Sequence, residues 1–214
     1  MVNKCAGKQD ILNLLIEKIG DRFCRQVIVA FLDEGLEINE CDKWGDTALM
    51  VASRYGRIGM AKLLIKEGAE VNMVDPNGIT PLHMACFAPA FEVVKLLVGK
   101  GAYVDVCDNH GRTPLHCACT KKRTDVIKLL LDEGADMYHK DDQGVTPLNV
   151  AHNYGCDRVI DCLMTRVEEN KQRKSHKILF PDGAELIVLG TWKDAMKVCH
   201  ERGLIPARIS CINP

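Results

Sequence analysis

The sequence has 214 residues, and 28 basic against 29 acidic side chains leave a formal net charge of −1. A charge so close to balance excludes an overall attraction to nucleic acid or to an acidic membrane. No stretch approaches the roughly 18 apolar residues of a spanning helix, and the N-terminus has no apolar signal segment. We therefore expect a monomeric cytoplasmic protein, with the nucleus as a second location.

Residues 1–40 are predicted to form a capping unit at the start of the chain. Apolar residues recur at helical spacing from Asp10 to Ile19, and a second apolar run, Val27–Leu32, leads to Gly35. The unit lacks the turn and Thr-Pro-Leu-His motifs found further along. Such a degenerate unit is expected where the outer face meets water and not another repeat.

A frame of 33 residues then recurs four times, over 42–74, 75–107, 108–140 and 141–168. Each copy opens on an Asp-x-x-Gly turn, and a second series of glycines ends an apolar run at the same spacing. The aspartates are Asp42, Asp75, Asp108 and Asp141, and the glycines of the second series are Gly35, Gly68, Gly101 and Gly134. A fixed period of this length predicts a solenoid of stacked units.

Each repeated residue type has a local physical role. Glycine can adopt the positive φ of a tight turn, and aspartate can accept hydrogen bonds from the turn's own N–H groups. Threonine after the turn is a favoured N-cap, and proline suits the first helical position. The glycine after the second apolar run is typical of a helix end. One unit is therefore predicted to be turn, helix, turn, helix.

These residues resemble the ankyrin repeat, whose pattern is Asp-x-x-Gly-x-Thr-Pro-Leu-His-x-Ala followed by a Val-x-x-Leu-Leu helix. The resemblance covers roughly residues 35–165 and implies an all-α solenoid whose short helices form two layers, with β-hairpin fingers along one edge. It also implies that His83 and His116, at the Leu-His position, bond to the backbone of the next repeat and are not catalytic.

Four departures from the frame carry information. Ala48 replaces the proline of the first repeat. The turn between the helices is apolar in the second repeat, Phe87-Ala-Pro-Ala-Phe, and basic in the third, Thr120-Lys-Lys-Arg-Thr-Asp. In the fourth repeat, Val167 stands where a helix-ending glycine is due. Residues 169–176 are therefore expected to continue the helix or to form a linker.

Residues 177–214 do not follow the repeat, and they resemble no family that we identify. Two apolar runs flank Pro181-Asp-Gly183, which predicts a β-hairpin, and Thr191–Gly203 has the features of a capped helix. We expect a small ββα unit that docks on the fourth repeat as a cap or pairs with a partner. Within it, Trp192 is either a core residue or a binding anchor.

The sequence offers little for catalysis or for metal and cofactor binding, so we expect no enzyme and no cofactor. It contains no phosphate-binding loop, no His-Glu-x-x-His and no paired Cys-x-x-Cys motif. Cysteines are odd in number, at 11, and several occupy small apolar positions of the frame, which favours reduced thiols. Cys117 and Cys119 follow His116, but their spacing on one helix points them to different sides.

Binding is predicted instead on residues that the fold does not need for itself. Repeat register places these at the fingertips and late in the first helix of each repeat, on the concave face. They are Lys43, Trp44, Arg54, Tyr55, Asn77, Ile79, Phe87, His110, Arg112, Lys121, Gln143, Asn153 and Tyr154. Trp44, Arg54 and Tyr55 are the expected hot spots, because Trp, Tyr and Arg most often carry binding energy.

Three hypotheses about function follow. The chain is expected to bind another protein, as an adaptor, scaffold or inhibitor. The alternative is a regulatory subunit or effector whose C-terminal tail carries a separate activity. A third, less favoured hypothesis is nucleic-acid binding through Lys121, Lys122, Arg123 and the basic run 171–177, which would show a steep dependence on salt.

Overall fold

The computed structural model describes residues 6–19, 24–172, 175–179, 185–189 and 208–212. The chain divides into two compact units, residues 1–160 and 161–214. The predicted boundaries at 168 and 176 fall inside the second of these units.

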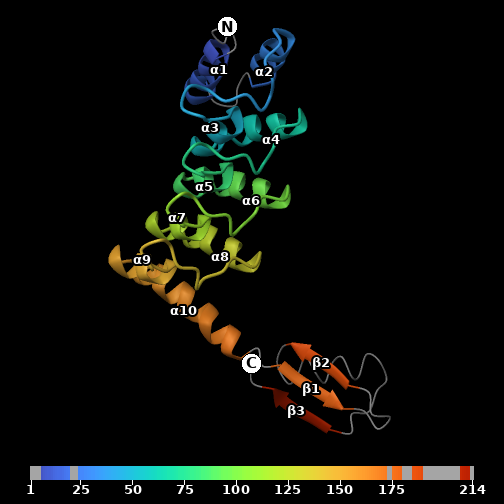
Figure 1. Ribbon diagram of the computed structural model, residues 1–214, viewed down its shortest axis with the longest axis vertical. Helices are drawn as coiled ribbons and strands as arrows, with labels where there is room; N and C mark the ends of the chain where they lie inside the picture. Colours follow the sequence, from blue (N-terminus) through green and yellow to red (C-terminus); the bar gives the residue numbers. More distant parts are fainter. Residues whose placement is uncertain (1–5, 20–23, 173–174, 180–184, 190–207, 213–214) are drawn as a thin grey trace. The chain divides into compact units, whose positions relative to one another are not determined.

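The first unit is a stack of helix pairs (Figure 1). The first helix of each pair contacts the first helix of the next, and the second helices contact one another in the same order from α2 to α8. The pairs are α1 (Ala6–Ile19) with α2 (Cys24–Asp33), α3 (Ala48–Arg54) with α4 (Ile58–Lys66), α5 (Pro81–Phe87) with α6 (Phe91–Gly99), and α7 (Pro114–Thr120) with α8 (Thr124–Asp132). Two helices follow, α9 (Pro147–Asn153) and α10 (Asp157–Gln172), and α10 crosses the boundary between the two units. The predicted two-layer solenoid is confirmed.

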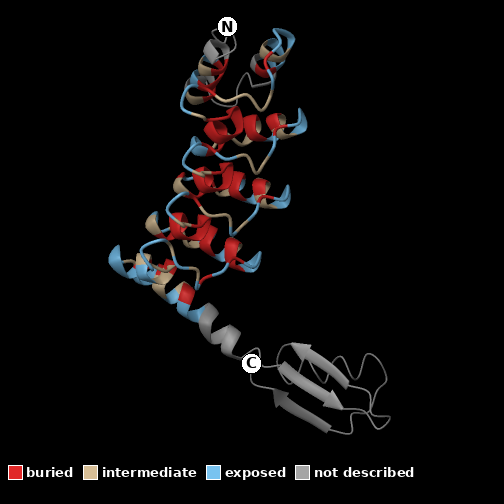
Figure 2. Cartoon of the chain, viewed as in Figure 1, coloured by how far each residue is buried: buried red, intermediate tan, exposed pale blue. Residues whose placement is uncertain are grey.

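The buried residues are concentrated in the helices α3 to α8 of the stack (Figure 2). Ala52, Ala85 and Ala118, one in the first helix of each of three repeats, are fully buried, and their small side chains let neighbouring helices approach closely. Leu49, Leu82 and Leu115, four residues after each turn glycine, are buried beside them. Because each repeat packs only on its neighbours, stability is distributed along the array and does not reside in one central core.

The fingers are short turns that each aspartate closes. In the second repeat, Oδ1 of Asp75 accepts the backbone N–H groups of Asn77 (2.8 Å) and Ile79 (2.7 Å). The other three fingers repeat this pair of bonds. Gly78 has a φ of +75°, and a Cβ there would lie 2.7 Å from Oδ1 of Asn109 in the next finger. The glycine therefore serves both the turn and the close approach of adjacent fingers.

The histidines of the second and third repeats connect each repeat to the next, as predicted. Nε2 of His83 donates to the carbonyl oxygen of Arg112 at 3.0 Å. Its Nδ1 accepts the backbone N–H of Thr80 at 3.3 Å and lies 2.9 Å from the Thr80 hydroxyl. His116 repeats the arrangement with Thr113 and with the carbonyl of the residue before the next N-cap, at 3.1 Å. Both rings are buried and use both nitrogens.

The two junctions on either side of the first repeat lack the histidine that connects the later repeats. In the capping unit, the residues that would form a finger by repeat register belong to helix α1 instead. From this helix, Nδ2 of Asn13 donates to Oδ2 of Asp42 (2.8 Å) and to the carbonyl of Asp46 (3.2 Å). That carbonyl corresponds to the ones that His83 and His116 reach in later repeats. The next junction has Met50 at the histidine position, fully buried, and a thioether cannot donate a hydrogen bond.

The turns between paired helices also differ from repeat to repeat. Gly56 and Gly155, at φ +65° and +58°, follow the first helices of the first and fourth repeats. In the third repeat the same position is Lys122, at φ +57°, the one non-glycine residue with positive φ in the described chain. The apolar turn predicted for the second repeat has Ala88 and Ala90 buried.

The second unit contains a three-stranded antiparallel sheet in the order β2-β1-β3. Strands β1 (Ser175–Leu179) and β2 (Glu185–Leu189) pair in the predicted hairpin sense, Ser175 opposite Leu189. The third strand, β3 (Arg208–Ile212), pairs with β1 and was not predicted. The predicted turn at 181–183 and the helix at 191–203, with Trp192, lie outside the described residues. α10 runs on to Gln172, which favours helix continuation over a linker after Val167.

Candidate protein-binding surface

The finger surface consists of the thirteen predicted binding residues and Lys122. These side chains come from the fingertips and from the turns that end the first helices, so the surface is repeated once per unit. Ten of the predicted residues are exposed, and Ile79, Phe87 and Arg112 are half-buried. The exposed set is Lys43, Trp44, Arg54, Tyr55, Asn77, His110, Lys121, Gln143, Asn153 and Tyr154.

The aromatic residues of this surface are uncovered. Trp44 is 65% exposed, Tyr154 is 53% exposed and Tyr55 is 41% exposed. Trp44 contacts its neighbour in the same finger, since Nζ of Lys43 lies 4.1 Å from the centre of its ring. A large aromatic side chain left this open on a folded protein gains contact area when a partner covers it.

The two arginines among the predicted residues already serve the fold. Nη2 of Arg54 lies 2.6 Å from Oδ2 of Asp46, and its Nε lies 3.4 Å from the sulfur of Met84 in the next repeat. Arg112 pairs with Asp108 at 2.7 Å. Burial works against ionisation of Asp108, but the hydrogen bonds from Arg112 hold the pKa of that carboxyl below its ordinary value. These charges are therefore partly neutralised within the protein.

The basic turn of the third repeat contributes two exposed lysines that form no ion pair among the described residues. Lys121 is exposed, and its Nζ lies 5.6 Å from the ring centre of Phe87 in the preceding repeat. Lys122 beside it is also exposed. Lys122 was missing from the predicted binding residues, although its replacement of a helix-ending glycine was a signal in the sequence.

Arg123, which the nucleic-acid hypothesis also names, forms bonds within the protein. Its guanidinium donates to the carbonyl oxygen of Ala88 in the preceding repeat and pairs with Asp125 at 3.0 Å. Arg57 has the same place in the first repeat and donates to the carbonyls of Ile16 (3.3 Å) and Glu17 (2.8 Å). Arginine here joins adjacent repeats because its fork of donors reaches carbonyl groups at the end of the preceding first helix.

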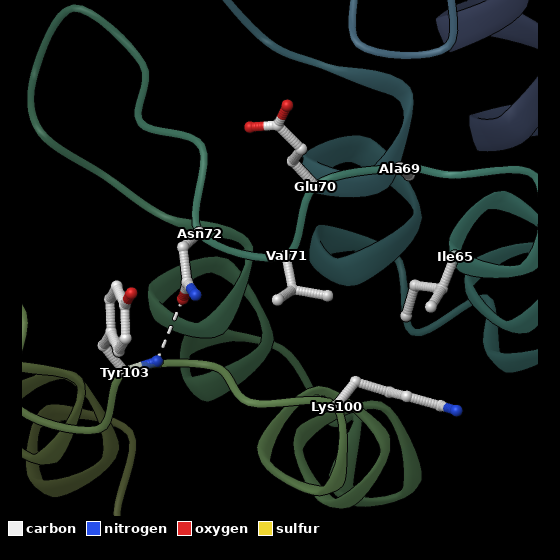
Figure 3. A pocket seen from close by; sticks show the side chains of 7 residues that line it. All are labelled: Ile65, Ala69, Glu70, Val71, Asn72, Lys100 and Tyr103. Atoms are coloured by element: carbon white, nitrogen blue, oxygen red, sulfur yellow. Dashed lines mark hydrogen bonds between the residues drawn. The ribbon is translucent and has the colours of Figure 1, made fainter.

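A surface hollow of about 470 Å³ lies away from these residues, where the ends of α4 and α6 meet the following loops. Asn72 spans it, accepting the backbone N–H of Tyr103 at 2.9 Å (Figure 3). The side chains of Glu70 and Lys100 on its walls point in different directions. The hollow is open, and a general acid and base are not brought together there.

Burial governs the ionisation of the buried histidines and cysteines. Burial lowers the pKa of His83 and of His116 below the ordinary value, so both rings are neutral. Burial raises the pKa of the Cys117 thiol to about 12, and Cys86 is shifted in the same direction. Among the described residues, no three His, Cys, Asp or Glu side chains are grouped as metal ligands would be. None of the helices described is long and apolar enough to cross a membrane.

Comparison with known families agrees with the repeat geometry. The family model for ankyrin repeats in three copies matches residues 5–108 and again 89–175. A search of curated proteins finds no match. Two matches that together span 5–175 of 214 residues cover well over half of the chain. With its finger turns, its histidine connections and its stacked helix pairs, the chain belongs to the ankyrin-repeat family.

Proposed function

We propose that this protein binds a partner protein through the finger surface, as an adaptor, scaffold or inhibitor without chemistry of its own. Ankyrin repeats are generally protein–protein interaction modules and are typically non-catalytic. The observation that carries the proposal is the exposure of Trp44 in a finger and of Tyr55 and Tyr154 at equivalent positions after the first helices of the first and fourth repeats. Their neighbours in the frame are committed to turns, caps and the helix interfaces.

The experiment is quantitative affinity capture from a lysate with the full chain as bait. The wild type is compared with the double variant Trp44→Ala/Tyr55→Ala, and removal of two hot-spot side chains is expected to reduce capture of a specific partner at least about tenfold. The matched control is Tyr103→Ala/Tyr138→Ala, because Tyr103 and Tyr138 are 67% and 60% exposed but lie outside the finger surface. Circular dichroism establishes that each variant is folded.

The two variants together decide the question. Loss of a partner in the first variant and its retention in the control supports binding through the finger surface. Equal capture by wild type and Trp44→Ala/Tyr55→Ala refutes these hot spots. If capture is lost only in the control, the binding site lies instead at the loops that carry Tyr103 and Tyr138.

A further inference from the structure

Lys122 occupies a position that the backbone reserves for glycine. The N–H of Lys122 bonds to the carbonyl of Cys119 at 3.1 Å, and the N–H of Arg123 bonds to the carbonyl of Ala118 at 3.0 Å. This is the hydrogen-bond pattern of a Schellman helix end, in which one residue adopts the left-handed conformation, usually glycine. Gly56 and Gly155 fill that place in two other repeats. A lysine at φ +57° costs stability of order 1 kcal/mol, because its Cβ crowds the backbone.

The lysines of this turn form no ion pair within the described chain, whereas two acidic groups of the same repeat are paired with arginines. Asp125 is paired with Arg123, and Asp108 with Arg112. The finger aspartates accept the N–H groups of their own turns. Exposed acidic groups also occur in adjacent repeats, with Asp142 in the last finger and Glu92 and Asp157 in the first turns of α6 and α10. Within the turn itself, Lys121 and Lys122 therefore present two ammonium groups that form no ion pair among the described residues, and Lys121 lies beside the ring of Phe87.

We propose that Lys121, Lys122 and Phe87 bind a segment of the partner that is rich in aspartate and glutamate, an inference that rests on the proposed function above. The two ammonium groups attract the carboxylates, and Phe87 gives an apolar contact for the stems of the acidic side chains. The cost of a left-handed lysine is then offset by binding. Strained residues of this kind tend to be kept at functional sites.

The test uses a variant that removes charge without harming the fold. Lys121→Gln/Lys122→Gly gives the left-handed position its preferred residue, so the free energy of unfolding should not fall. The matched control is Lys95→Gln/Lys128→Gln, which removes two exposed lysines from the second helices α6 and α8, outside the finger surface. Binding of a short, fluorescently labelled Glu- and Asp-rich peptide to each full-length protein is followed by anisotropy, with the Gln- and Asn-containing analogue alongside.

We expect the wild type to prefer the acidic peptide, with affinity that falls as salt rises. The Lys121→Gln/Lys122→Gly variant should bind it about five- to tenfold more weakly, as expected for two exposed ion pairs, while Lys95→Gln/Lys128→Gln should stay within about twofold of wild type. Equal losses in both variants, no preference over the amide analogue, or no binding at about 1 mM peptide would each overturn the proposal.

Two further outcomes separate this inference from its alternatives. Tighter binding of a single-stranded oligonucleotide than of the peptide, through the same lysines, would assign the turn to phosphate recognition and overturn it. If the peptide fails but partner capture still depends on Trp44 and Tyr55, only the acidic character of the partner is refuted. If the Trp44→Ala/Tyr55→Ala variant captures the partner as well as the wild type does, the proposed function itself is refuted.

Discussion

The stability of the repeat array should fall between pH 7.5 and 5.5 because of His83 and His116. Each ring is neutral in the fold, with a proton on the nitrogen that donates to the next repeat. Protonating Nδ1 would replace an acceptor by a donor opposite the N–H of Thr80 or Thr113. Burial accordingly lowers both pKa values from the ordinary 6.5.

The sign and size of the effect follow from linkage. Below pH 6.5 the two histidines are protonated in the unfolded chain but stay neutral in the folded chain. The stability they contribute is therefore fully present above the ordinary pKa and is lost as the pH falls below it. At one pH unit below, each histidine can contribute a loss of up to about 1.4 kcal/mol, and the two together up to about 3 kcal/mol. Carboxylates with ordinary pKa values change little in this range, since those values lie about two units below 6.5. Burial raises the pKa of Asp46, but Asp46 is common to the wild type and to the histidine variants compared with it.

Urea unfolding followed by circular dichroism at pH 7.5, 6.5 and 5.5 measures this loss. The comparison is His83→Asn/His116→Asn, which copies the fourth repeat, where Asn149 occupies the same position and accepts the N–H of Thr146 at 3.0 Å. The variant keeps the helix caps and loses the bonds between repeats, so it should be about 1–3 kcal/mol less stable at pH 7.5.

The variant should also show the weaker pH dependence, so that its stability and that of the wild type converge toward pH 5.5. Replacement of the exposed His110 by asparagine is the control and should leave the pH dependence of the wild type unchanged. If the wild type and the double variant lose stability in parallel, the buried neutral histidines are not responsible and the reasoning is refuted.

Three further predictions concern single features of the chain. Met50→His should add the missing donor to the carbonyl of Ile79 and raise the free energy of unfolding by about 1 kcal/mol in urea titrations; a decrease would mean that the ring does not fit. Gly78→Ala should destabilise by about 1–3 kcal/mol, and by more than Gly68→Ala, because both have positive φ but only Gly78 has a neighbour within 4 Å of the added Cβ. Deletion of residues 175–214 should leave partner capture intact in the same assay, and loss of capture by a folded repeat array would favour an active role for the tail.

The exposure of most of the proposed binding residues could be predicted from repeat register alone, because the repeated frame indicates which positions each repeat uses for turns, caps and helix packing. Trp44, Tyr55 and Tyr154 are exposed at the expected positions. The engagement of Arg54 and Arg112 in ion pairs could not be predicted in the same way. Arg54 reaches a carboxylate eight residues away and a sulfur in another repeat, and an arginine side chain is long enough for several alternative partners.

The sequence by itself determined the turns, the helix caps and the order of the helices, since each depends on residues within a few positions of one another. The tertiary structure alone decided the contacts between segments far apart in the sequence. These are the bonds of Asn13 in α1 to the first repeat, the carbonyls bound by Arg57 and Arg123, and the pairing of β3 with β1. Local signals repeat every 33 residues and can be recognised by spacing. A contact between distant segments depends instead on which groups the packed backbone brings within about 3 Å, and no local pattern specifies that distance.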